Sequence, residues 1–348
     1  MKVSSLMDHP RTNQSTRRNA TSRRHLLALC AMATALVPAM ALGGDPARAQ
    51  EDSWPTRPVT VIVPFAAGGN TDVMARMASQ KLSEAFKQSF VVENRVGAGG
   101  AIAAHYVLQQ PADGHTLFFA AAPQIAVVPN IQKVNYDPVK DFAPVSVFGT
   151  GPFILAIKGD IPAKTVPEFV EYAKKSKITF GSGGTGSVGH LSGALFVARA
   201  GLDAVHAPFR GGAPALNALL GGQIDMYFGN ASEIIPHAEG GKIRVLAVAA
   251  DERMSQLPDT PIVSEFYPKF SLNAWNGFVV RSGTPKAIID KIAQAVIAAA
   301  KDPKNAAQLQ KLGIQANGTT PEEMADQIKR EQPQFDIAIK AANLGLPK

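Results

Sequence analysis

The fold is decided by the stretch Val59-Thr-Val-Ile-Val-Pro-Phe-Ala-Ala-Gly-Gly-Asn-Thr-Asp72, where a short apolar strand runs into a glycine-rich loop that opens directly onto a helix. The same order returns in Ile178-Thr-Phe-Gly-Ser-Gly-Gly-Thr-Gly-Ser-Val-Gly-His190. The first N–H groups of a helix lack intrahelical partners and the helix dipole adds partial positive charge, so each junction can hold a carboxylate or phosphate without a lysine. One junction in each half of the chain predicts a ligand held between two lobes.

Strand-length apolar runs alternate with helical patterns along the rest of the chain, which is typical of α/β proteins. We expect further strands at residues 90–92, 116–120, 153–157, 205–209, 224–228 and 244–249. We expect helices at residues 71–86, 101–109, 166–175, 191–200, 213–220, 286–300 and 321–342. The sequence therefore predicts an α/β protein in which each lobe is a mostly parallel sheet flanked by helices.

The N-terminal residues are predicted to be a signal peptide, residues 1–49. Paired arginines precede an apolar run at 26–42, and Ala47-Arg-Ala49 places small residues where a signal peptidase reads, which predicts cleavage between Ala49 and Gln50. The paired arginines also fit a twin-arginine signal, so either export route is open. The single cysteine, Cys30, lies inside this leader, so the mature chain has no disulfide or thiol chemistry. We expect a periplasmic protein.

The length of the mature chain, about 299 residues, suits two domains better than one core. Two apolar segments, 151–157 and 276–280, lie where the chain could leave one lobe and return to it. They predict a discontinuous lobe 1, residues 50–152 plus 276–348. Lobe 2, residues 153–275, is then inserted between its two parts.

Charge and composition exclude several classes of function. The formal charge is +7, but the leader holds seven of the 35 Lys and Arg residues and two of the 28 Asp and Glu residues, which leaves +2. No basic run and no basic-aromatic pattern indicates nucleic-acid binding. No apolar run of the mature chain reaches the roughly 20 residues of a membrane span, and no His, Asp or Glu cluster has metal-ligand spacing. We expect no metal, no cofactor and a monomer.

The two junction loops supply most of the predicted ligand-binding residues. Arg210 is a further candidate, since its guanidinium could bind a carboxylate through two N–H groups, although a solvated loop arginine is an equal alternative. Asn230 is a candidate as a donor or a helix cap. Asp72 and His190 have equally simple structural interpretations, as a helix cap and as a residue bonded to its own loop. The predicted loop residues are Phe65, Gly68, Gly69, Asn70, Thr71, Asp72, Ser182, Gly184, Thr185, Ser187 and His190.

Two enzymatic alternatives remain open at the second junction. The run 181–186 satisfies G-x-G-x-x-G between a strand and a helix, which allows a dinucleotide-binding oxidoreductase. Export and the crowd of hydroxyl groups in this turn argue against a nucleotide. The run 185–189 misses the hydrolase elbow G-x-S-x-G by one residue, and His190 is only three residues from Ser187, so a serine hydrolase is the weaker alternative.

Eight motifs in order resemble the Bug-type substrate-binding proteins of tripartite tricarboxylate transporters, and the resemblance covers essentially the whole mature chain. The motifs are Trp54–Pro58, Val63–Asp72, Val92–Gly100, Pro111–Leu117, Tyr136–Val145, Gly181–His190, Phe209–Pro214 and Gly222–Phe228.

The resemblance implies a non-catalytic periplasmic receptor with the two-lobed flytrap fold of periplasmic binding proteins. Such a receptor closes on a small organic carboxylate and delivers it to the membrane permease subunits of the transporter. It implies that the loops at 65–72 and 182–190 hold one carboxylate between them. It also places Arg210 and Gly211 where the second lobe meets the ligand.

Two departures from the family pattern concern the far end of the ligand. The turn Ala121-Ala-Pro-Gln124, in which we expect Ala122 to face the ligand, stands where many members have hydroxyl groups. Phe209 stands where many have tyrosine. Both changes predict a less polar distal end of the bound acid.

Overall fold

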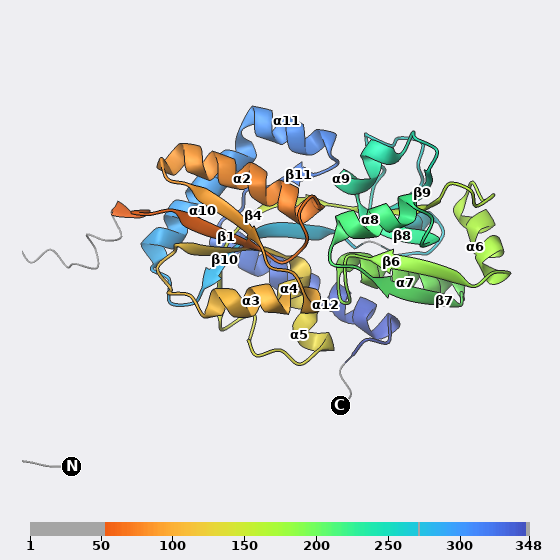
Figure 1. Ribbon diagram of the computed structural model, residues 1–348, viewed down its shortest axis with the longest axis horizontal. Coiled ribbons are helices and arrows are strands. Elements are labelled where there is room, and N and C mark those ends of the chain that lie inside the picture. The colour runs from red at the N-terminus through yellow and green to blue at the C-terminus, as the bar shows by residue number, and fades with distance from the viewer. Residues whose placement is uncertain (1–52, 271, 346–348) are drawn as a thin grey trace, which may run out of the picture. The chain divides into compact units, whose positions relative to one another are not determined.

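Two β-sheets form the framework of the protein (Figure 1). The computed structural model describes residues 53–270 and 272–345, which all fall in one compact unit. The signal peptide and its cleavage site lie outside the described residues, so both remain predictions. In their spatial order, the strands of the first sheet are β11 (Gln315–Ala316), β4 (Phe142–Gly151), β10 (Ala274–Arg281), β3 (Thr116–Ala121), β1 (Val59–Val63) and β2 (Phe90–Asn94).

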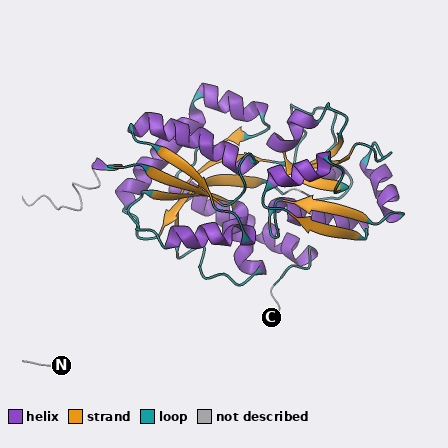
Figure 2. Ribbon diagram, viewed as in Figure 1, coloured by secondary structure: helices purple, strands orange, loops and turns teal. Residues whose placement is uncertain are grey.

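The second sheet is separate from the first, and the two groups of strands are visible in Figure 2. We call the part of the chain built on the first sheet lobe 1 and the part built on the second sheet lobe 2. The predicted residue boundaries between the lobes remain a proposal. In spatial order, the strands of the second sheet are β7 (Ala204–Pro208), β6 (Ile178–Ser182), β8 (Met226–Asn230), β5 (Phe153–Lys158) and β9 (Ile243–Ala249).

Strand direction adds one detail to the expected fold, because each mostly parallel sheet also contains at least one strand that runs against the others. In lobe 1, β1 pairs in parallel with β2 and β3, whereas β10 runs antiparallel to both β3 and β4. In lobe 2, β6 pairs in parallel with β7 and β8, whereas β5 runs antiparallel to β8 and β9. The reason is that β5 and β10 directly follow the two passages of the chain between the lobes, so they start where the neighbouring strands end.

Helices cover both faces of the lobe 1 sheet, so its strands are apolar on both sides. Successive residues of β3 show this: Leu117 and Phe119 belong to one buried cluster, and Phe118 and Ala120 to another. The first cluster lies under α2 (Asn70–Phe86), α10 (Lys286–Lys301) and α11 (Pro303–Lys311); the second lies under α3 (Ala101–Leu108), α4 (Ala122–Ala126) and α12 (Pro321–Ala341).

Lobe 2 follows the same rule. Ile154 and Ala156 of β5 pack on one face, and Phe153, Leu155 and Ile157 pack on the other. The helices on the first face are α8 (Gly212–Leu220) and α9 (Ala231–Ile234); those on the second are α6 (Val166–Lys174) and α7 (Val188–Ala200). The remaining short helices are α5 (Val128–Ile131), η1 (Ala98–Gly100), η2 (Ile235–His237) and η3 (Val263–Glu265).

The C-terminal helix α12 joins the two lobes by packing. It contacts β4 and α4 of lobe 1 and α7 of lobe 2, and it lies between the lobes in Figure 1. The Gln332 side chain donates from Nε2 to the carbonyl oxygen of Ala126 at 3.0 Å. Pro333 follows inside the helix, where it cannot donate a backbone hydrogen bond. Among the described helices, none is long and apolar enough to cross a bilayer.

Candidate functional site

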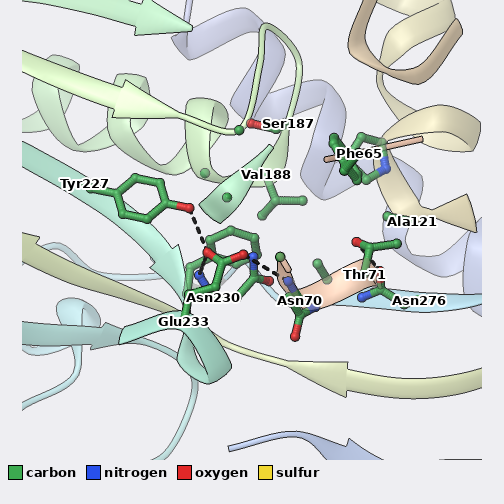
Figure 3. Close-up of a pocket in the computed structure, with 17 residues that line it drawn as sticks. Phe65, Asn70, Thr71, Ala121, Ser187, Val188, Tyr227, Asn230, Glu233 and Asn276 are labelled. Atoms are coloured by element: carbon green, nitrogen blue, oxygen red, sulfur yellow. Dashed lines mark hydrogen bonds between the residues drawn. The ribbon is translucent and has the colours of Figure 1, made fainter. Parts of the chain in front are cut away.

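A cavity lies between the lobes, at the carboxyl ends of β1, β3, β6 and β8 (Figure 3). Its volume is about 50 Å³, measured as the space open to the centre of a water molecule. A single water needs roughly 10–15 Å³ on that measure, so a small solute fits. The lining residues are Phe65, Gly69, Asn70, Thr71, Ala121, Pro123, Phe153, Gly183, Ser187, Val188, Gly189, Gly212, Tyr227, Asn230, Glu233, Ala274 and Asn276.

The first junction brings the start of α2 to the cavity. Gly69 precedes the helix with extended backbone, and the first bond of the helix runs from the Val73 N–H to the Gly69 carbonyl at 3.0 Å. The N–H of Thr71 therefore has no intrahelical partner. The Thr71 hydroxyl donates to Asn276 Oδ1 at 2.7 Å, which leaves the amide nitrogen of Asn276 available as a donor at the cavity.

Asp72 belongs to the same junction but is fully engaged within lobe 1. Its carboxylate accepts hydrogen bonds from Gly68 N at 2.9 Å, Asn94 Nδ2 at 2.8 Å, and Arg76 Nε and Nη2 at 2.9 and 3.0 Å. Burial acts to raise the pKa of Asp72, but the bonds from Arg76, Gly68 and Asn94 outweigh it and hold the pKa below its usual value. Gly68 and Asp72 do not line the cavity. Asp72 instead holds in place the loop whose other residues, Phe65 and Gly69, line it.

Asp72→Asn should destabilise the protein by about 1–2 kcal/mol, because the amide loses the charge that pairs with Arg76 and turns a second donor toward Asn94. Urea unfolding at neutral pH measures the effect. Asp290→Asn is the matched control, since Asp290 pairs with exposed Lys286 one helical turn away and should matter by less than about 0.5 kcal/mol. Equal effects of the two substitutions would contradict the assigned role of Asp72.

The second junction brings the start of α7 to the opposite side of the cavity. Ser187 caps the helix, its hydroxyl oxygen accepting from the His190 N–H at 3.2 Å. The N–H of Leu191 makes the first helical bond, to the Ser187 carbonyl. The N–H groups of Val188 and Gly189 therefore lack intrahelical partners, and both residues line the cavity. Helix starts from different lobes thus meet at one cavity.

His190 and Ser182 lie behind this loop and not in the cavity lining. The His190 ring stacks on His206 with centroids 3.7 Å apart, and Phe180 stacks on the other side of His206. His190 Nδ1 accepts from the Gly186 N–H at 3.1 Å, and Ser182 Oγ lies 2.7 Å from His206 Nε2. Burial and the neighbouring His206 lower the pKa of His190 to about 3, and burial lowers the pKa of His206 to about 4.

A second cavity, of about 490 Å³ on the same measure, shares the lining residues Phe65 and Gly183 with the first. Gly184, Thr185 and Arg210 line this second cavity, together with the glycine-rich turn at 97–100. The Ala66 N–H donates to the Arg210 carbonyl at 3.0 Å across the two lobes. Gly211 faces Ala66 with φ of 146°, a conformation open to glycine, and does not line either cavity.

Glu233, which the sequence did not indicate as a site residue, lies in the cavity wall, and its carboxylate accepts three hydrogen bonds. Its Oε1 accepts from the Asn70 N–H at 3.0 Å, and its Oε2 accepts from the Tyr227 hydroxyl at 2.8 Å and the Asn230 N–H at 3.3 Å. Figure 3 shows the carboxylate between Tyr227 and Asn70. Burial raises the pKa of Glu233, against the pull of these bonds, and burial with the adjacent Glu233 raises that of Tyr227.

The structure therefore divides the predicted site residues. Phe65, Gly69, Asn70, Thr71, Ser187 and Asn230 line the first cavity; Gly184, Thr185 and Arg210 line only the second. Ala122 is fully buried at the start of α4, while its neighbours Ala121 and Pro123 reach the cavity. Which of these residues contact a ligand remains a prediction. Within the described ranges, no three His, Cys, Asp or Glu side chains are grouped so as to hold a metal ion.

The comparison with protein families identifies the class of protein. Residues 74–344 match the tripartite tricarboxylate transporter family receptor, TctC. The UPF0065 protein of the tcbD–tcbE intergenic region of Pseudomonas sp. (strain P51) is 33% identical over 306 residues, covering 86% of this chain and 91% of the relative. Protein BugT of Bordetella pertussis is 32% identical over 256 residues, covering 72% and 78%. The chain belongs to this receptor family and is of the Bug type.

Solved structures agree on the fold. Rpa4515 of R. palustris, solved with adipate, is 33% identical with a TM-score of 0.81, covering 84% of this chain and 99% of that one. MatC of Rhodopseudomonas palustris, with bound malate, is 32% identical with a TM-score of 0.78, covering 82% and 100%. The two-lobed periplasmic-binding-protein fold and the non-catalytic receptor class are confirmed.

The enzymatic alternatives are accordingly wrong. His190 Nδ1 accepts from the Gly186 N–H, and Ser187 Oγ accepts from the His190 N–H, so both side chains bind backbone groups of this segment. In the G-x-G-x-x-G run, a Cβ at Gly181 would overlap the Ile224 side chain, so this glycine serves packing within lobe 2.

Proposed function

We propose that this protein is a periplasmic solute receptor that binds a small organic carboxylate between its lobes and delivers it to the permease of a tripartite tricarboxylate transporter. The observation that carries the proposal is the pair of helix starts, Thr71 of α2 and Val188 of α7, at one cavity. Their N–H groups supply partial positive charge from both lobes. The adipate and malate in the structures of Rpa4515 and MatC support a carboxylate as the ligand class.

Closure links the two lobes directly as well as through a solute. The Ser232 hydroxyl donates to Asn70 Oδ1 at 2.7 Å, and the Ala66–Arg210 and Asn70–Glu233 bonds also run between the lobes. A solute shifts the open–closed equilibrium only through its preference for the closed form. A carboxylate that accepts N–H groups from both α2 and α7 would have that preference, because it binds both lobes at once. The permease would then distinguish the closed form.

The proposal predicts thermal stabilisation by carboxylates without turnover. At a hundredfold excess over the dissociation constant, a bound acid should add about 2.7 kcal/mol to the free energy of unfolding, which thermal melting detects as a rise of several degrees. The test uses the mature protein with a panel of mono-, di- and tricarboxylates and amino acids. The corresponding neutral amides or alcohols, without a carboxylate, are the controls. A panel in which no acid raises the melting temperature would rule the proposal out.

A further inference from the structure

We infer that Glu233 makes the cavity selective for carboxylates that also carry an ammonium or amide N–H, and that it excludes dicarboxylates whose second carboxylate would face it. This inference rests on the proposed function, which it deepens by naming the class of solute. It concerns the part of the solute that lies away from the helix start of α7.

The first argument is the charge of the cavity wall. Among the described residues that line the cavity, Glu233 alone has a side chain that ordinarily carries a charge, and that charge is negative. Only 6% of Glu233 is exposed, so solvent screens it weakly. A carboxylate placed beside it would be repelled, whereas an ammonium group would be attracted. The wall offers no basic side chain to offset a second negative charge.

The second argument is the hydrogen-bonding capacity of Glu233. A carboxylate has about four acceptor positions and no donor. Oε2 accepts from the Tyr227 hydroxyl and the Asn230 N–H, Oε1 accepts from the Asn70 N–H, and the Asn230 side chain also interacts with the carboxylate. Every one of these partners is a donor. A solute group that lies against Glu233 must donate as well, which an ammonium or an amide does and a carboxylate does not.

The third argument is that the carboxylate cannot turn away from the cavity. The three donors to Glu233 come from α2, β8 and the start of α9, so both oxygens are fixed from several sides. Gly212 lies so close that a Cβ there would overlap the Glu233 carboxyl group. A fixed, desolvated acceptor discriminates strongly between a ligand that pairs with it and one that leaves it unpaired.

The opposite side of the cavity supplies the complementary donors for the carboxylate of the solute. Val188 and Gly189, whose N–H groups lack intrahelical partners, line the cavity from α7, and Asn276, whose amide oxygen accepts from Thr71, lines it from lobe 1. A zwitterion can thus place its carboxylate against these donors and its ammonium against Glu233. Adipate and malate, the acids bound by Rpa4515 and MatC, carry two carboxylates and cannot make both contacts.

Calorimetric titration with matched pairs of acids tests the inference. Three pairs keep the number of carbon atoms and replace one terminal carboxylate with an aminomethyl group: succinate with 4-aminobutanoate, glutarate with 5-aminopentanoate, and adipate with 6-aminohexanoate. A fourth pair, succinate with aspartate, adds an ammonium group and keeps both carboxylates. In the best-fitting pair, the wild-type protein should bind the amino compound at least tenfold more tightly. Glu233→Gln, which keeps the size and removes the charge, should reduce this preference at least tenfold. Glu171→Gln, an exposed glutamate of α6, is the control and should leave it unchanged.

The outcomes separate this inference from the proposed function. If no acid of either kind binds, the proposed function fails. If acids bind but each dicarboxylate equals or exceeds its amino partner, the receptor function stands and the role of Glu233 is refuted. The order of dissociation constants measured with the wild-type protein decides this without any variant. The test therefore remains valid even if Glu233→Gln folds poorly. A preference that persists unchanged in folded Glu233→Gln protein would also overturn the assignment.

Discussion

Replacing Gly69 with leucine should weaken solute binding at least a hundredfold and leave folding nearly unchanged. A Cβ on Gly69 would lie 3.4 Å from Glu233 Oε1 and 3.6 Å from the backbone nitrogens of Gly212 and Ala213, all atoms of lobe 2. A methyl group just fits there, but the further carbons of leucine would occupy space that lobe 2 fills on closure. The backbone of Gly69, with φ of −82° and ψ of 171°, accepts any residue.

A graded series makes this prediction sharp. Gly69→Ala should bind within a few fold of wild type, and Gly69→Leu should not bind measurably, with melting temperatures of both variants close to that of wild type. Gly240→Leu is the control, because Gly240 is an exposed glycine of a lobe 2 loop with only ordinary contact distances around it. Calorimetry and thermal melting give the two readouts. Undiminished binding by Gly69→Leu would mean that the lobes do not close over this residue.

Acid should destabilise the protein steeply below pH 6.5, before most carboxylates are protonated. The folded protein lowers the pKa of His190 to about 3 and that of His206 to about 4, so between these values and about 6.5 the unfolded chain binds more protons. Stability is therefore fully present above the ordinary histidine pKa and is lost as pH falls. Each histidine contributes a slope of about 1.4 kcal/mol per pH unit. Because His206 is partly exposed, solvent screening reduces its contribution. The free energy of unfolding should then fall by about 4 kcal/mol between pH 6.5 and pH 4.5.

The variant His206→Phe isolates this effect. Phenylalanine keeps a ring between Phe180 and His190 but removes one proton-binding group, so the slope of unfolding free energy between pH 6.5 and 4.5 should fall by about half. Urea unfolding at several pH values measures it. His105→Phe, at an exposed position of α3, should keep the wild-type slope. If His206→Phe keeps it as well, the stacked histidines are not the source of acid sensitivity.

Much of the order of helices and strands was predictable because local patterns specify it, but strand β4 and helix α11 were not among the expected elements. The β-branched run of β1, the glycines that follow it and the start of α2 lie where the sequence pattern places them. The antiparallel placement of β10 was not predictable in this way, because it follows from where the chain re-enters lobe 1 and not from the residues of β10. The short helices α4 and α5 were missed for a related reason, since each has fewer residues than a helical pattern needs to become visible.

The site was predictable where backbone groups form it and unpredictable where side chains meet across lobes. Glycine loops before helices identified Gly69, Thr71 and Ser187, which all line the cavity. Glu233 gave no such signal, because an acid three residues after Asn230 reads as a helix cap. Its contact with Asn70 spans 163 positions of sequence. The contact joins two lobes, so no local pattern around Glu233 indicates it.

Helix α12 has a consequence for the mechanics of closure. A continuous helix that packs on both lobes would resist their relative motion in proportion to its bending stiffness. Pro333 removes one backbone hydrogen bond next to Gln332, which attaches the helix to lobe 1. Helix α12 is therefore easiest to bend near Gln332, which bonds it to lobe 1. A relative motion of the two lobes would therefore bend α12 most readily near Pro333.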